Sequence, residues 1–74
     1  MKNLINAKTN SNLIFVSAKG GRGAMQRLTD MGLLPGERLR VLHNTGFGPV
    51  TVLIKGAKVA LGHGLASKII VEEE

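Results

Sequence analysis

The segment that most constrains the fold is residues 23–36, which read GAMQRLTDMGLLPG. Met25, Leu28 and Met31 recur there at helical spacing, so a short helix over this segment would have one apolar face, with polar side chains on the other. Every other segment of the chain reads as a short strand or a turn. We therefore expect one short helix that packs a single face against a β structure.

The end of this helix is also predicted by its residues. Gly32 can adopt the left-handed conformation that closes a helix, and Leu33 then falls where a Schellman cap places it against Leu28. Pro35 cannot continue the helix, and Pro35-Gly36 suits the central positions of a type II turn. The chain should therefore reverse directly into the next strand.

Five short strands are expected in the rest of the chain, because short apolar or alternating runs are separated by turn residues such as Gly56 and Gly62. A one-turn helix over residues 65–68 precedes the last strand. Glycine at nearly every corner favours a small, strongly bent antiparallel barrel of the SH3-like type, with an OB-like barrel as the alternative. The five expected strands cover residues 13–18, 38–43, 50–54, 58–61 and 69–72.

The two ends of the chain read differently from its middle. Residues 1–12 are mostly polar, and we expect a loosely held lead-in from which Leu4 or Ile5 reaches the core. Residues 72–74 form an acidic tail, which should fray in solvent. Residues 1–74 as a whole are expected to form a single domain.

Composition limits the class of protein. The 74 residues contain no cysteine, and 43% of them are hydrophobic, which is enough for a compact core. The longest apolar run, residues 13–16, is too short to cross a membrane, and no signal sequence opens the chain. We expect a cytoplasmic protein.

The charge is strongly basic outside the tail. The net charge is +5, but residues 1–71 carry +8, because they include ten basic residues and only two acidic ones, Asp30 and Glu37. Such a surface suits nucleic acid, an acidic protein face or the anionic inner leaflet of a membrane, and it can equally be a solvated surface without a partner. Charge alone does not choose among these alternatives.

Two stretches, RLTDMGLLPGERLRVL and GPVTVLIKGAKVALGHGLASKIIV, resemble the FeoA family, ferrous iron transport protein A, over residues 13–72. The resemblance implies a cytoplasmic SH3-like domain that assists the membrane ferrous-iron transporter and contacts its cytosolic GTP-binding domain. The chain also resembles the C-terminal domain of iron- and manganese-dependent transcriptional repressors, but these residues include no DNA-binding region. An accessory transport protein, expected to be a monomer, is therefore favoured over a detached repressor domain.

An exposed leucine is our leading candidate for partner binding. If Leu33 folds back onto the helix, Leu34 is held extended by Pro35 and should point to solvent. The alternative is that Leu34 fills one end of the barrel. The expected docking surface comprises Arg27, Met31, Leu34, Arg38 and Arg40.

Metal chemistry and catalysis have little support in the sequence. His43 and His63 are the only histidines, and with no cysteine a closed transition-metal site is hard to assemble, so they are weak candidates for Fe²⁺ or another divalent metal. No serine or aspartate forms a nucleophile motif with either histidine. We expect a non-enzyme without a cofactor.

An RNA- or ribosome-binding barrel is the alternative from another class, because the basic surface suits it. Barrels that bind single strands stack bases on several surface aromatics. Phe15 and Phe47 are the only aromatics, and Phe15 lies in the strand that reads as most buried. We therefore expect no nucleic-acid partner.

Overall fold

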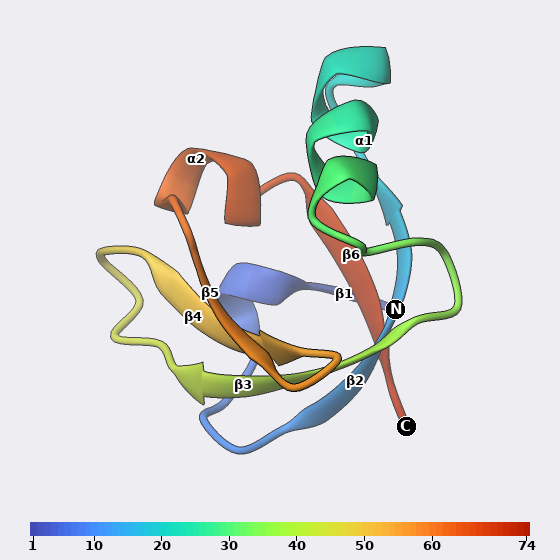
Figure 1. Cartoon of the computed structure of the whole chain (residues 1–74). Helices are drawn as coiled ribbons and strands as arrows, with labels where there is room; N and C mark the ends of the chain where they lie inside the picture. The colour runs from blue at the N-terminus through green and yellow to red at the C-terminus, as the bar shows by residue number, and fades with distance from the viewer.

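The computed structural model describes residues 1–74 and contains one six-stranded antiparallel sheet in the order β1-β6-β2-β3-β4-β5. The sheet bends around the core into a small barrel, with α1 and α2 at one end (Figure 1). The outer strands β1 and β5 do not pair with each other, so the barrel is open between them. The elements are β1 (Lys2–Asn3), the 3-10 helix η1 (Leu4–Asn6), β2 (Asn12–Ala18), α1 (Gly21–Asp30), β3 (Arg38–His43), β4 (Val50–Ile54), β5 (Ala57–Leu61), α2 (His63–Ala66) and β6 (Ile69–Glu73).

The mainly β, SH3-like class is confirmed, with a helix between β2 and β3 and a one-turn helix before the last strand. Two details differ from the expectation. There are six strands instead of five, because Lys2 and Asn3 add a short strand to β6. The one-turn helix begins at His63, two residues earlier than expected, since Gly62 already takes the N-cap position.

The core is built from alternate residues of the strands and from one face of α1. No polar or charged residue is buried, so the interior is entirely apolar. The curved sheet and α1 surround this interior as one cluster. Its members are Leu4, Ala7, Leu13, Phe15, Leu28, Leu33, Leu39, Val41, Val50, Val52, Ile54, Leu61, Ala66, Ile69 and Val71.

Helix α1 begins at Gly21, two residues before the expected start, because Gly20 takes the N-cap position with φ +96°. The predicted apolar face is confirmed: Leu28 is buried, while Met25 and Met31 are half-buried against the core. Neither α1 nor α2 has the length and apolar character of a helix that crosses a membrane.

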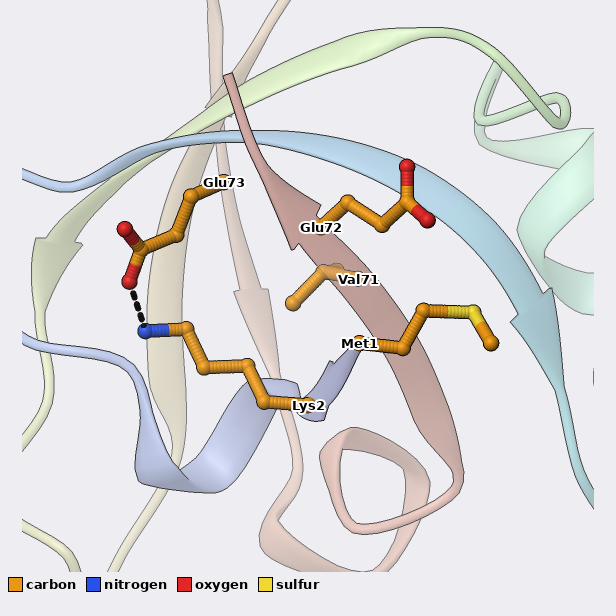
Figure 2. A pocket seen from close by; sticks show the side chains of 5 residues that line it. All are labelled: Met1, Lys2, Val71, Glu72 and Glu73. Carbon is orange, nitrogen blue, oxygen red and sulfur yellow. Dashed lines mark hydrogen bonds and ion pairs between the residues drawn. The ribbon is translucent and has the colours of Figure 1, made fainter.

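The lead-in is docked rather than loose, and this corrects the sequence-based expectation. Lys2 pairs with Val71 across β1 and β6. Leu4 is completely buried in the core, so the expectation that Leu4 or Ile5 reaches the core is confirmed. The ammonium of Lys2 donates a 2.6 Å hydrogen bond to a carboxylate oxygen of Glu73 (Figure 2). The expectation failed because a two-residue strand has no recognisable pattern of its own.

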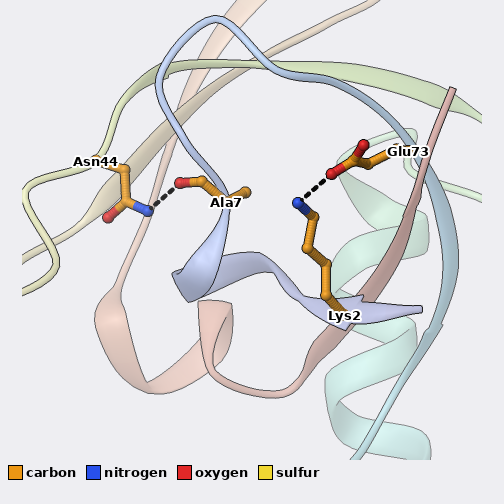
Figure 3. Close-up of polar contacts among 4 residues, drawn as sticks. All are labelled: Lys2, Ala7, Asn44 and Glu73. Atoms are coloured by element: carbon orange, nitrogen blue, oxygen red, sulfur yellow. Dashed lines mark hydrogen bonds and ion pairs between the residues drawn. The ribbon is translucent and has the colours of Figure 1, made fainter.

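A second attachment of the lead-in comes from the loop after β3. The side-chain amide of Asn44 donates to the carbonyl oxygen of Ala7 at 2.8 Å (Figure 3). It also donates to the carbonyl oxygen of Ile5 at 3.0 Å. Asn44 therefore supplies donors to two lead-in carbonyls that the sheet does not pair, which keeps residues 5–7 in place.

The acidic tail is also more ordered than expected. Glu72 and Glu73 pair with Ile14 and Leu13 of β2, so β6 continues one residue beyond the predicted end of the strand. The amide of Glu74 donates to Asn12 at 3.1 Å, and its carboxylate lies 3.1 Å from Nε of Arg38. Backbone pairing and this ion pair hold the tail against the sheet.

Candidate interaction surface

The turn after α1 has the geometry that the sequence predicts. Gly32 has φ +87°, and the amides of Gly32 and Leu33 donate to the carbonyls of Thr29 at 2.9 Å and Leu28 at 2.8 Å. These two bonds define a Schellman cap. Leu33, at 0% exposure, is consequently buried in the same core cluster as Leu28.

Leu34 follows this cap on the outside of the molecule, with 44% of its surface exposed. The amide of Glu37 donates to the carbonyl of Leu34 at 2.9 Å, and Gly36 has φ +92°, as a type II turn requires. The turn is also bonded to β2, because Gly36 donates to Phe15 at 2.8 Å and Phe15 donates to Glu37 at 2.9 Å. A half-exposed leucine is thus presented on a turn fixed from both sides.

Arg27 and Met31, the two α1 residues of the predicted docking surface, differ in exposure. Met31 is half-buried against the core, whereas Arg27 is exposed and lines a hollow of about 510 Å³ between α1 and α2. Neither Met31 nor Leu34 lines that hollow. The other residues around it are Gly20, Gly23, Ala24, Gly64, Leu65 and Lys68.

Arg38 and Arg40 lie on the outer face of the sheet, as their alternation with buried Leu39 predicts. Arg40 pairs in register with Leu53 of β4, and Leu53 pairs with Lys58 of β5, so a half-buried leucine lies between two cations. A groove of about 300 Å³ crosses this outer face. Its lining residues are Asn12, Arg38, Leu39, Arg40, Leu53, Lys55, Gly56 and Glu74.

An ion pair connects the Leu34 turn to this basic sheet face. The ammonium of Lys55, in the turn between β4 and β5, lies 3.2 Å from a carboxylate oxygen of Glu37. Arg38 is engaged by Glu74, while Arg40 and Lys58 take part in no ion pair. The Leu34 turn and the basic outer face of the sheet therefore form one surface. On it, Arg40 and Lys58 have no acidic partner.

Gly56 and Gly62, both expected to have a structural role, differ in the sign of their φ angle. Gly56 has φ +81° and follows Lys55 at φ +51°, so the β4–β5 turn is a two-residue type I′ turn in which glycine is favoured. Gly62 has φ −56°, and a Cβ built on it would have no atom within 4 Å. The structure gives no conformational reason for glycine at position 62.

The two histidines do not form a metal site with other ligands. A register shift between Val41 and His43 interrupts the alternation of β3, and His43 is exposed. His63 is exposed at the first residue of α2. No three His, Cys, Asp or Glu side chains gather as metal ligands would, and the lack of Fe²⁺ binding in solution stays a prediction.

A hollow of about 420 Å³ near the termini is lined by charged side chains of both signs. Lys2 points toward Glu73, while the side chains of Met1 and Glu72 extend away from this pair (Figure 2). The Lys2 ammonium, by its hydrogen bond and its charge, lowers the pKa of the exposed Glu73 carboxyl below its ordinary value. The Lys2–Glu73 pair joins β1 to β6. We therefore assign these two side chains a structural role and not a binding role.

One exposed residue that the sequence-based docking surface omits is Phe47, which is 92% exposed at the tip of the β3–β4 loop. The loop is ordered by bonds from Gly46 to the Asn44 side chain at 3.0 Å and from Phe47 to the Thr45 hydroxyl at 3.4 Å. In the sequence, its position between two glycines in a turn is the signal that could have indicated this exposure.

Comparisons with known proteins agree on one family. The model of the FeoA domain matches residues 2–73. A Methanocaldococcus jannaschii protein provisionally named Fe(2+) transport protein A is 45% identical over 67 residues, which cover 90% of this chain and 80% of the relative. A crystal structure of an iron uptake regulatory protein (FeoA) superposes with a TM-score of 0.90 at 33% identity, over 99% of this chain and 97% of that one.

The barrel also occurs inside a larger protein. A manganese-dependent transcriptional repressor matches 99% of this chain with 41% of its own, at a TM-score of 0.87 and 24% identity. At that identity the likeness shows a shared fold alone.

Proposed function

The chain belongs to the FeoA family, and from this membership we propose that it is an accessory protein of ferrous iron uptake. In this proposal it is a non-catalytic cytoplasmic module that binds the membrane ferrous-iron transporter at its cytosolic GTP-binding domain. The name of the Methanocaldococcus jannaschii relative supports the link to Fe²⁺ transport. The absence of a nucleophile motif in the sequence supports a binding role.

The observation that carries the docking proposal is the position of Leu34. An apolar side chain exposed on a rigid turn loses little conformational freedom when a partner covers it. Binding energy commonly concentrates in a few such residues, with charged residues around them that select the partner. The basic outer face of the sheet, which Lys55 joins to the Leu34 turn, supplies those charges through Arg40 and Lys58. These charges favour an acidic partner.

RNA binding is less well supported by the side chains. Phe15 is completely buried in the core, so Phe47 is the one aromatic that a base could stack on. Proteins that bind single strands generally present several such platforms. A protein partner therefore fits the surface better.

The direct test replaces Leu34 with aspartate. Because Leu34 is half-exposed, Leu34→Asp should keep a dispersed NMR spectrum while its affinity for the GTP-binding domain of the transporter from the same organism falls by about tenfold or more. Isothermal titration calorimetry with both purified proteins measures this change.

The neighbouring leucine provides a matched control. Leu33→Ala empties a core position and should cost about 2–5 kcal/mol of unfolding free energy, without a specific effect on binding by the molecules that remain folded. A folded Leu34→Asp variant with unchanged affinity would remove Leu34 from the docking surface. No binding by the unmodified chain would refute the proposed function itself.

A further inference from the structure

Strand β5 leaves one long edge of the sheet unpaired. It is the last strand in the order and pairs only with β4, whereas the other outer strand, β1, has two residues. An unpaired edge presents backbone donors and acceptors that another extended chain can use.

The register identifies which groups are free. Ile54 and Ala57 flank a two-residue turn, and such a flanking pair exchanges both of its hydrogen bonds. Alternation then makes Val59 a bonded partner of β4, while the N–H and C=O groups of Lys58 and Ala60 point away from the sheet. The free edge therefore offers two amides and two carbonyls.

The side chains on β5 specify what an added strand would carry. Lys58 and Ala60 are exposed on the outer face, where Lys58 lies across from Leu53 and beyond it Arg40. On the inner face, Val59 is only partly buried against the core cluster. A matching strand would place acidic side chains beside Lys58 and an apolar side chain beside Val59.

We propose that the free edge of β5 is the docking site for an extended, acidic segment of the partner, which adds as a further strand with acidic and apolar residues in alternation. This inference rests on the proposed function, because it names how the GTP-binding domain of the transporter would be held. Charge complementarity carries it: Arg40 and Lys58 have no ion pair, while Arg38 and Lys55 already have acidic partners.

A second copy of this chain fits less well as the occupant. Its own acidic strand is β6, whose Glu72 and Glu73 are paired in the sheet and whose Glu73 is bonded to Lys2. Releasing that strand would break the sheet between β1 and β2. An external acidic segment does not carry this cost.

The first test reads single backbone amides. In the free chain, hydrogen exchange followed by NMR should be fast at Lys58 and Ala60 and slow at Val59 and Leu61, because only the latter two donate to β4. Addition of the GTP-binding domain should slow Lys58 and Ala60 by at least about tenfold. A complex that forms without this change at either amide would overturn the inference and leave the proposed function standing.

The second test removes one donor. Ala60→Pro deletes the outward N–H without touching the bonds to β4, and edge strands tolerate proline in this orientation. It should weaken binding by about tenfold, whereas Ala60→Ser, which keeps the amide, should bind within about twofold of the unmodified chain. Equal affinities for both folded variants would count against strand addition.

Charge reversal and a simple peptide complete the design. Lys58→Glu should weaken binding by about tenfold, while the control Arg22→Glu on exposed α1 should not. A short peptide of alternating glutamate and valine should shift the Lys58 and Ala60 amides even if the transporter domain does not bind, in which case the proposed function fails and the edge site stands. Failure of the peptide and the domain together refutes both.

Discussion

At the scale of single residues, a few backbone conformations decide where the chain turns. Gly32 closes α1 with φ +87°, and this conformation directs Leu33 into the core and leaves Leu34 outside. The same residue therefore couples the stability of the barrel to the position of the proposed anchor. A Cβ at Gly32 would meet no atom within 4 Å, so the cost of any side chain there is purely conformational.

Gly32→Val should reduce the free energy of unfolding by about 1–3 kcal/mol, because valine is strained at positive φ. Urea denaturation followed by circular dichroism measures the loss. Gly62→Val is the matched control, since that glycine has a negative φ and open space for a Cβ, and it should cost clearly less. Equal denaturation midpoints for the two variants would contradict the cap assignment.

At the scale of elements, short strands far apart in the sequence hold each other in place. β1 is only two residues long, yet it pairs with β6, and Lys2 bridges to Glu73 at 2.6 Å. Because the folded pKa of Glu73 lies below its ordinary value of 4.5, the pair stabilises the fold above that pH. The contribution is lost as pH falls through the lowered pKa.

Glu73→Gln should therefore lower the melting temperature slightly at neutral pH and have no effect once the pH is well below 4.5. The effect should be small and should shrink in high salt, because both side chains are solvated. Differential scanning calorimetry across this pH range checks it. Glu72→Gln, which removes a carboxylate without an ion pair, should show no such pH-dependent difference; identical profiles for both variants would exclude the bridge as a stabilising contact.

The sequence predicted the elements whose signals are local. The α1 cap and the turn that follows it, from Leu28 to Gly36, depend on neighbouring residues and were predicted, and the structure shows their hydrogen bonds. The lead-in and the tail were predicted as loose because their order depends on partners far away in the sequence, such as Glu73 for Lys2. A register shift near His43 was equally invisible, because a bulge depends on the opposite strand.

At the scale of the whole molecule, the barrel divides its surface by charge. Two of the three acidic residues at the C-terminus form ion pairs within the chain, Glu73 with Lys2 and Glu74 with Arg38. The outer face around Arg40 and Lys58 keeps its positive charge, next to the exposed Leu34. This arrangement suits an interaction module for an acidic partner. Docking residues could be suggested from the sequence only where a turn or strand alternation fixed their direction.

Binding to the transporter is tested most directly by an NMR titration of the isotope-labelled chain with the GTP-binding domain of that transporter. We expect saturable shifts or broadening confined to the Leu34 turn, the outer face of β3 and β4, and the β5 edge, and these changes should persist at physiological salt. A spectrum that stays unchanged through excess domain, or small shifts spread over all basic residues that vanish with salt, would contradict the proposed binding.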